Sequence, residues 1–379
     1  MARYWRLSQF YFFYFASLGA LVPFWSVYLK SLGFSALQIG QLMSTLAVTK
    51  IVAPYLWGWI ADRTGYHIRI VQLTSLLALL CFLPLLWYDH YGMVLLPMLA
   101  FSFFWNAALP QFEVVTLAGL GAHKHRYSRI RLWGSLGFIA TVSLLGVVLQ
   151  RIGIDALPWV LLGLFAAIWL SSLPVQEQRH RAGDGGHILD VLRQPAVIAL
   201  LLSCFLMQAS HGPYYTFYSL YMEGFGYGRG QVGLLWALGV FAEVLLFWYM
   251  HRLFAWRPAR FWMSLSLLLA TLRWTLMALF PDVLTLVLLA QTLHAASFGM
   301  FHASAIHLID DFFPRHRGRG QALYAAVSFG AGGAVGSLFA GTLWDAVSPM
   351  TTFLGAAVAA LLGFFVSLRL RESPAHAGA

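Results

Sequence analysis

Charged side chains are scarce in this sequence of 379 residues, where they make up only 10%. Hydrophobic residues account for 60%, and the mean hydropathy is +0.72. A soluble core of this length could not hide so much apolar surface from water. The apolar runs come close to the roughly 20 residues that a helix needs to span a bilayer, and they lack the alternation of membrane β-strands. The composition therefore predicts an all-α membrane protein that is embedded in a lipid bilayer.

Cysteine is nearly absent as well. Cys81 and Cys204 both lie inside apolar runs, which excludes a disulfide framework and a cysteine-based metal site. The sequence has no GxxxxGK[ST] loop to bind a phosphate. His302 and His307 stand five residues apart rather than four, and no glutamate follows His302, so a zinc-binding HExxH pair is excluded too. We therefore expect no enzyme, no ATP-driven pump, no metal and no other cofactor.

The cations are not gathered on one face, as a nucleic-acid partner would require of a chain with a formal net charge of +10. They are scattered in short loops, so no nucleic-acid partner is expected. Most fall on one side of the predicted membrane, and only Lys30, Arg151 and Arg229 fall on the other. By the positive-inside rule, both termini are predicted to face the cytoplasm, in a bacterial inner membrane.

Twelve apolar segments are predicted to span the membrane. They cover residues 7–29, 38–61, 68–88, 91–117, 130–150, 155–174, 196–222, 230–252, 259–280, 283–310, 320–345 and 350–369. An even number agrees with termini on one side. The longest polar stretch, 176–195, follows the sixth segment, and we predict that it links an N-terminal six-helix bundle (1–175) to a C-terminal one (196–379).

The second half repeats the first at an offset of 193 residues. The offset aligns Phe24 with Phe217, Ser26 with Ser219, Tyr28 with Tyr221, Gly33 with Gly226, Gln38 with Gln231 and Gly40 with Gly233. A parallel repeat of this kind is typical of a secondary transporter, in which two similar bundles rock about a central substrate site. The sequence thus predicts two pseudo-symmetric six-helix bundles.

The loop between the second and third segments reads Gly58-Trp-Ile-Ala-Asp62-Arg63-Thr-Gly65, which resembles the cytoplasmic signature loop of the major facilitator superfamily. Gly58 and Gly65 would permit a tight helix end, while Asp62 could meet a helix N-terminus and Arg63 a partner or a lipid phosphate. A solvated turn without a gating role is the alternative. The equivalent loop of the second half, residues 251–260, lacks the aspartate and both glycines.

Four further motifs narrow the resemblance. Pro23-Phe-Trp-Ser-Val-Tyr-Leu-Lys, Arg131-Leu-Trp-Gly-Ser, Leu238-Gly-Val-Phe-Ala-Glu243 and Arg273-Trp resemble the phenylpropionate permease group of that superfamily. The likeness covers nearly the whole chain. It implies the major facilitator fold and proton symport of an aromatic or other small solute, in an architecture related to the lactose and nucleoside permeases. We group Arg131 with the gating motif.

Ionisable side chains inside the apolar segments are functional candidates, because a charge near the bilayer centre is costly without a partner. Lys50 and Glu243 are equivalent at the 193-residue offset and could pair across a central cavity, with Lys50 also meeting the substrate's anionic group. Glu243 is the main proton-coupling candidate. Glu113 is a second one, unless it simply hydrogen-bonds to Asn106 on its own helix face. We assign Arg273 to an ion pair; pairs that only fix helix register are the alternative for all of these charges.

Two polar helix faces could line one pocket. His294, Phe298 and His302 share a face of the tenth segment, and Gln208, His211 and Tyr215 share a face of the seventh. His294 or His302 could relay protons, although a neutral histidine bonded between helices is also common in membranes. Tyr11 and Tyr14 of the first segment, with Tyr215 and Tyr218 of the seventh, offer flat rings that suit an aromatic substrate.

We therefore expect a monomeric importer of a small aromatic carboxylate, driven by the proton gradient. Three alternatives remain open at this point. The first is proton symport of a nucleoside or sugar, in which Lys50 would serve only the ion network, and the second is a proton-antiporting exporter. The third is a solute sensor with the same fold.

Overall fold

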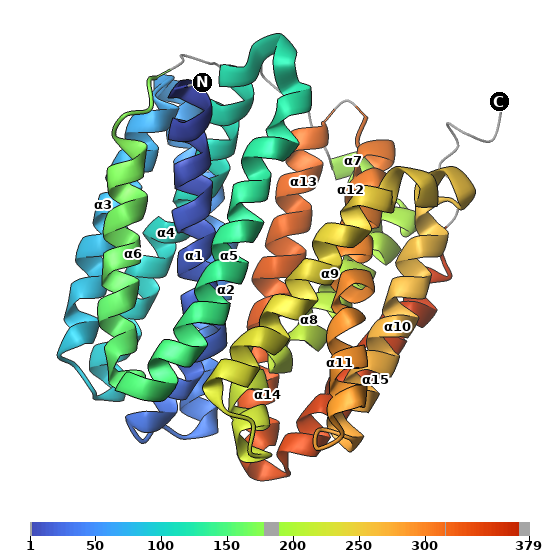
Figure 1. Ribbon diagram of the computed structural model, residues 1–379. Coiled ribbons are helices and arrows are strands. Elements are labelled where there is room, and N and C mark those ends of the chain that lie inside the picture. The colour runs from blue at the N-terminus through green and yellow to red at the C-terminus, as the bar shows by residue number, and fades with distance from the viewer. Residues whose placement is uncertain (1, 178–188, 315, 371–379) are drawn as a thin grey trace. The chain divides into compact units, whose positions relative to one another are not determined.

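The computed structural model describes residues 2–177, 189–314 and 316–370, and within these ranges it contains helices and no strand (Figure 1). In chain order the helices are α1 (Ala2–Ser31), α2 (Ala36–Thr64), α3 (His67–Phe82), η1 (Leu83–Leu86), α4 (Tyr91–Leu120), η2 (Gly121–Arg126), α5 (Tyr127–Ile152), η3 (Ile154–Ala156), α6 (Leu157–Ser172), α7 (Leu189–Leu192), α8 (Pro195–Gly224), α9 (Arg229–Trp256), α10 (Ala259–Leu279), α11 (Leu284–Thr292), η4 (Ala295–Met300), α12 (Phe301–Phe312), α13 (Arg317–Ala325), η5 (Ala326–Gly332), α14 (Gly333–Ala346) and α15 (Pro349–Ser367). Of these, η4 and η5 are π-helical turns inside longer helices.

The predicted membrane spans are confirmed. Across the described ranges, 12 helices are long and apolar enough to cross a membrane when each run through a π-turn, or through the 3₁₀ turns η1 and η3, is taken as one helix. The largest differences are at two ends: α1 begins at Ala2 rather than residue 7, and α9 ends at Trp256 rather than residue 252. The α1 extension contains Arg3 and Arg6, so a search for apolar residues stops before that helix does. The α9 extension, residues 253–256, is apolar and lies between Arg252 and Arg257, so the arginine before it ended the predicted segment early.

The helix boundaries repeat with the spacing predicted from the sequence. The first residues of α1 and α8, of α2 and α9, and of α4 and α11 are each 193 positions apart. The helix starts are also capped alike, because the Gln38 side chain accepts from Ser35 N at 3.0 Å and that of Gln231 accepts from Gly228 N at 2.9 Å. The repeat therefore includes the local hydrogen bonds that cap the start of a helix.

The exposed helix faces repeat as well. Exposed residues on α2 are Val48, Val52, Tyr55, Leu56 and Trp59, and their equivalents on α9, which are also exposed, are Phe241, Leu245, Trp248, Tyr249 and Arg252. Each set recurs at helical spacing, so each forms a single stripe along its helix. Lys50 and Glu243 are again equivalent, and both are only partly exposed.

Contacts divide the chain into two compact units. Unit 1 combines Met1–Gly183 with Thr216–Ala237, and unit 2 combines Asp184–Tyr215 with Leu238–Ala379. The α8–α9 hairpin therefore packs with the first six helices. The predicted domain boundaries follow the polar linker 176–195 instead, and most of that linker lies outside the described residues.

In unit 1, the α8–α9 hairpin is held against the end of α5 by polar and close-packed contacts, which we call the hairpin contact. Arg229 donates to Glu223 at 3.1 Å and to the Leu149 carbonyl oxygen at 3.3 Å. Gly230 N donates to Gln150 Oε1 at 3.0 Å. A Cβ atom added at Gly146 would lie 2.5 Å from the Arg229 carbonyl oxygen, so the two backbones meet only because this residue is glycine.

In unit 2, α10 packs against α15, α12, α11 and η4. The η5–α14 region approaches α8 at glycines: a Cβ atom added at Gly332 would lie 2.6 Å from the Phe205 carbonyl oxygen, and one at Gly336 would overlap the backbone of Ala209. Trp274 Nε1 of α10 donates to Ser210 Oγ of α8 at 3.1 Å. These contacts bring α8, α10 and η4 together around the site described next.

Candidate functional site

The polar centre of unit 2 is built around Arg273 on α10. We call Arg273, His294, Ser297, Glu243 and Tyr214 the Arg273 cluster. Arg273 is 0% exposed, and its Nη1 donates to His294 Nδ1 at 3.1 Å and to Ser297 Oγ at 2.9 Å. Its guanidinium carbon lies 4.3 Å from the ring centroid of Tyr214 and 4.3 Å from that of Trp274. Aromatic faces thus replace part of the water that a guanidinium would otherwise bind.

The position of the His294 ring proton follows from these contacts. A guanidinium can only donate, so Nδ1 accepts, and the proton of neutral His294 is on Nε2. That Nε2 lies 3.6 Å from Glu243 Oε2, which is an ion-pair distance rather than a hydrogen bond. A second proton on His294 would displace Arg273 from Nδ1. Glu243 is therefore the member of this pair that can gain a proton without breaking the bond to Arg273.

Aromatic rings from α8 and η4 extend the Arg273 cluster from its member His294. The His211 and Tyr215 rings stack at 5.7 Å between centroids, and those of His294 and Phe298 at 5.3 Å. His211 is 6.4 Å from His294 and 6.4 Å from Phe298. We call these four rings the aromatic wall. The two helix faces predicted from the sequence are thus brought together within one unit.

Other predicted residues lie elsewhere. His302 stacks on Phe298 at 6.3 Å and contacts the Tyr324 hydroxyl through Nδ1 at 2.9 Å, one step beyond the aromatic wall. Gln208 packs against Gly332 on η5: a Cβ atom added at Gly332 would lie 3.1 Å from the Cβ atom of Gln208. The Tyr218 ring contacts Trp236 at 5.5 Å, and both belong to unit 1 rather than to the Arg273 cluster.

Gln291 and Ser297 were missed by sequence reasoning. Gln291 is buried on α11 and accepts from the Tyr214 hydroxyl at 3.0 Å. Both residues stand three positions from His294, so they share its helix face. Polar residues at that spacing inside an apolar segment were the signal that could have identified them. In the described part of the chain, no group of three or more His, Cys, Asp or Glu side chains could hold a metal ion.

Unit 1 contains its own polar cluster around Glu113 on α4. Glu113 accepts from the Tyr127 hydroxyl at 3.1 Å and is close enough to Arg131 to interact electrostatically. The Arg131 guanidinium lies 3.9 Å from the centroid of the Phe15 ring, and the Tyr11 ring is 6.4 Å from that of Tyr127. Arg131 is thus packed among aromatic rings and a carboxylate, which the predicted gating motif did not anticipate.

Asn106 does not supply the hydrogen bond considered for Glu113. Its side-chain nitrogen donates to the Leu46 carbonyl oxygen at 2.9 Å and to Thr49 Oγ1 at 2.8 Å, which ties α4 to α2. Lys50 follows Thr49 directly. Within unit 1 and among the described residues, the Lys50 side chain has no hydrogen bond and no ion pair.

Tyr14 of α1 is held in place by α4. Its hydroxyl donates to the Trp105 carbonyl oxygen at 3.3 Å, and its ring stacks on that of Trp105 at 5.1 Å between centroids. The Tyr11 hydroxyl donates to Thr116 Oγ1 at 3.3 Å. Both tyrosines are buried. Their hydroxyl hydrogen bonds join α1 to α4 within unit 1.

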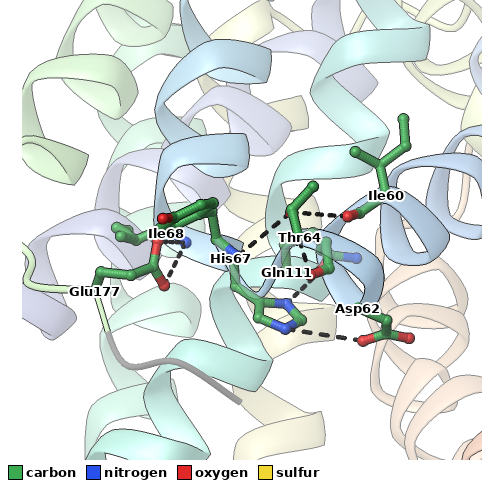
Figure 2. Close-up of polar contacts among 9 residues, drawn as sticks. Ile60, Asp62, Thr64, His67, Ile68, Gln111 and Glu177 are labelled. Atoms are coloured by element: carbon green, nitrogen blue, oxygen red, sulfur yellow. Dashed lines mark hydrogen bonds and ion pairs between the residues drawn. The ribbon is translucent and has the colours of Figure 1, made fainter. Parts of the chain in front are cut away.

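The signature loop joins α2 to α3 (Figure 2). Gly65 ends α2 in the left-handed conformation, with φ +73°, as the predicted tight helix end requires. Gly58 does not end a helix, because it lies inside α2, where an added Cβ would be 3.2 Å from Gln111 Nε2 of α4. The Arg63 guanidinium lies 4.0 Å from the centroid of the Trp59 ring.

The carboxylate that meets the start of α3 belongs to Glu177 rather than to Asp62. Glu177 accepts from Ile68 N at 3.1 Å and from Arg69 N at 3.3 Å, as Figure 2 shows for Ile68. Asp62 instead faces buried His67, with 3.8 Å between Oδ1 and Nε2, and His67 Nδ1 contacts Gln111 Oε1 at 2.9 Å. The motif thus connects α2, α3 and α4 through one imidazole.

The comparisons with known proteins agree with this architecture. The model of the MFS_1 like family matches residues 4–355. A probable 3-phenylpropionic acid transporter of Escherichia coli (strain K12) is 29% identical over 88% of this chain and 89% of the relative. A maltose permease of Geobacillus stearothermophilus is 26% identical over 97% and 95%.

Among solved structures, the nucleoside transporter NupG superposes with a TM-score of 0.85 at 17% identity, covering 98% of this chain and 99% of NupG. At that identity the likeness shows the fold alone. The family match, in contrast, spans most of the sequence. The chain therefore belongs to the MFS_1 like family of the major facilitator superfamily, and it is a membrane transporter and not an enzyme.

Proposed function

We propose that this transporter carries a small aromatic carboxylate together with a proton, inward across a bacterial inner membrane. The observation that supports it most is the Arg273 cluster, in which Glu243 faces a histidine whose proton position is already fixed. The relative from Escherichia coli, whose name specifies 3-phenylpropionic acid, supports the class of substrate. The aromatic wall offers flat apolar surfaces beside that cluster.

Glu243 is the proposed proton carrier. As a carboxylate it is attracted to Arg273 and faces the Nε2–H of His294; as a neutral acid it loses that attraction. Gaining or losing one proton therefore changes how strongly α9 is held to α10 and η4. A proton that alters helix packing in this way can be coupled to substrate movement. His302 and Glu113 are the proposed secondary proton sites.

Lys50 is the proposed partner of the substrate's carboxylate. It is an ammonium in the middle of α2 whose charge is not already paired within its unit. Arg131 is less suited to this role, because it is engaged with Glu113 and Phe15. A cation in a dry site attracts an anionic ligand strongly, so a neutral ligand would gain less from Lys50.

Uptake by purified protein in proteoliposomes tests this function. With an inward proton gradient, labelled 3-phenylpropionate should accumulate, and a protonophore should abolish accumulation. Glu243→Gln should lose uphill accumulation but keep counterflow exchange, since it removes the titratable group without emptying the site. Asp282→Asn, an exposed change between α10 and α11, is the matched control.

Three outcomes would each contradict a different part of the proposed function. Uphill uptake by Glu243→Gln would place proton coupling at another residue. Accumulation of maltose or nucleosides, but not of aromatic acids, would show that the substrate class is wrong. Accumulation only under the opposite gradient would indicate an exporter.

A further inference from the structure

Two buried polar atoms beside the Arg273 cluster have no partner among the described residues. His211 and Gln291 are both 0% exposed, yet Nε2 of His211 and Nε2 of Gln291 make no hydrogen bond. Buried polar groups are nearly always bonded, so each exception calls for an explanation. A ligand that completes these bonds is one such explanation.

The chemistry of the two atoms is complementary. His211 Nδ1 lies 2.9 Å from the Met207 carbonyl oxygen, which can only accept, so Nδ1 carries the ring proton and Nε2 is a bare acceptor. Gln291 Oε1 accepts from the Tyr214 hydroxyl, so its amide nitrogen is a donor. Turning the amide over would still leave one of its ends without a partner. The site therefore offers one unfilled acceptor and one unfilled amide.

Both residues border the aromatic wall. The His211 ring is 6.4 Å from that of His294, and the Tyr214 ring, whose hydroxyl contacts Gln291, is 5.9 Å from it. His211 and Tyr214 are three residues apart on α8, and Gln291 precedes His294 by three, so each pair shares a helix face. The two residues with unfilled atoms thus lie on helix faces that meet at the His294 ring.

A hydroxyl is the group that fits these two positions. It donates one hydrogen bond and accepts others, whereas an ether oxygen only accepts and an ammonium only donates. An ammonium would also be repelled by the guanidinium of Arg273, which is in the same cluster. A hydroxyl adds no charge and has both the donor and the acceptor that these two atoms lack.

We propose that the transported aromatic acid carries a neutral hydroxyl, which donates to His211 Nε2 and accepts from the amide of Gln291. This inference rests on the proposed function, because it adds a second recognised group to the aromatic carboxylate. His211 and Gln291 are then the residues that determine which aromatic acids are bound.

Three probes on the purified transporter test the proposal: 3-phenylpropionate, its ring-hydroxylated analogues and the corresponding methoxy analogues. The best hydroxylated probe should bind about tenfold or more tightly than the parent acid, because it completes hydrogen bonds that are otherwise lost. Its methoxy counterpart should lose that gain, since it cannot donate. Calorimetry or tryptophan fluorescence would measure the affinities.

Variants then assign the effect to His211. His211→Asn keeps a donor for the Met207 carbonyl but has no atom at the Nε2 position. The ratio of the affinity for the hydroxylated probe to that for 3-phenylpropionate should therefore fall to nearly one. The readout is the ratio of the two affinities within each variant, so a general loss of affinity for aromatic acids on removal of the His211 ring cancels. His307→Asn, an exposed histidine that packs on Phe254, is the matched control.

The probes also separate the two proposals without any variant. Equal binding of parent, hydroxylated and methoxy probes would overturn the hydroxyl proposal while leaving the aromatic-acid function intact, and would indicate that only water fills the two positions. Failure of every aromatic acid to bind, with binding of sugars or nucleosides, would overturn both. A preference that persists in His211→Asn would also overturn the assignment.

Discussion

One added methyl group should open the hairpin contact. A Cβ atom at position 146 would lie 2.5 Å from the Arg229 carbonyl oxygen, whereas ordinary contacts begin at 3.4 Å. Gly146→Ala therefore requires the α8–α9 hairpin to move from α5 by roughly 0.9 Å, the difference between these values. Overpacking of this kind costs about 1–3 kcal/mol. That cost favours the separated state by about 5-fold to about 150-fold.

Thiol labelling would measure the opening. Val232 of α9 is 0% exposed, so a cysteine there should react slowly while the contact is closed. In a background without Cys81 and Cys204, Gly146→Ala should raise its maleimide labelling rate by at least about fivefold. Gly163→Ala on α6 is the control, because an added Cβ there meets nothing within 4 Å. An unchanged rate in Gly146→Ala would refute the reasoning.

Three further predictions concern the substrate, the signature loop and the topology. Affinity measurements should show that Lys50→Met loses binding of aromatic carboxylates and that Lys50→Arg keeps part of it. If adding Glu243→Gln to Lys50→Met restores the affinity, Lys50 serves only an ion pair. Gly65→Ala should destabilise the protein by about 1–2 kcal/mol, seen as a lower midpoint of thermal unfolding, because φ +73° is unfavourable for alanine; an equal midpoint would contradict this. A cysteine at Gln176 should react only with a reagent on the cytoplasmic side and one at Gly226 only from the periplasm; the reverse pattern would invert the predicted orientation.

The membrane fold could be predicted because it depends on properties that are local in sequence. Apolar runs fix the helices, and the 193-residue repeat fixes which helices are equivalent. The faces shared by His294 and Phe298 and by His211 and Tyr215 were also predictable, since helical spacing determines them. These features need no knowledge of tertiary contacts.

Contacts between distant segments could not be predicted. Glu177 meets the start of α3 from 109 residues away, and nothing near Ile68 in the sequence indicates it. Arg131 was read as part of a gating motif, and only packing places it over Phe15. Tyr218 shares α8 with His211, yet α8 is divided between the two units just before it. Such outcomes depend on which helices meet, and a single sequence does not contain that information.

The π-helical turns have a consequence for how related sequences are aligned. A π-turn holds one more residue than the α-helical turn it replaces, and η4 and η5 lie in helices whose counterparts in the first half, α4 and α5, contain no π-turn. One residue can therefore be lost within Ala295–Met300 or Ala326–Gly332 while the residues on either side keep their places. A loss elsewhere in either helix would rotate everything beyond it by about 100°. We expect relatives that differ in these helices by a single residue to have their gap at one of these two turns.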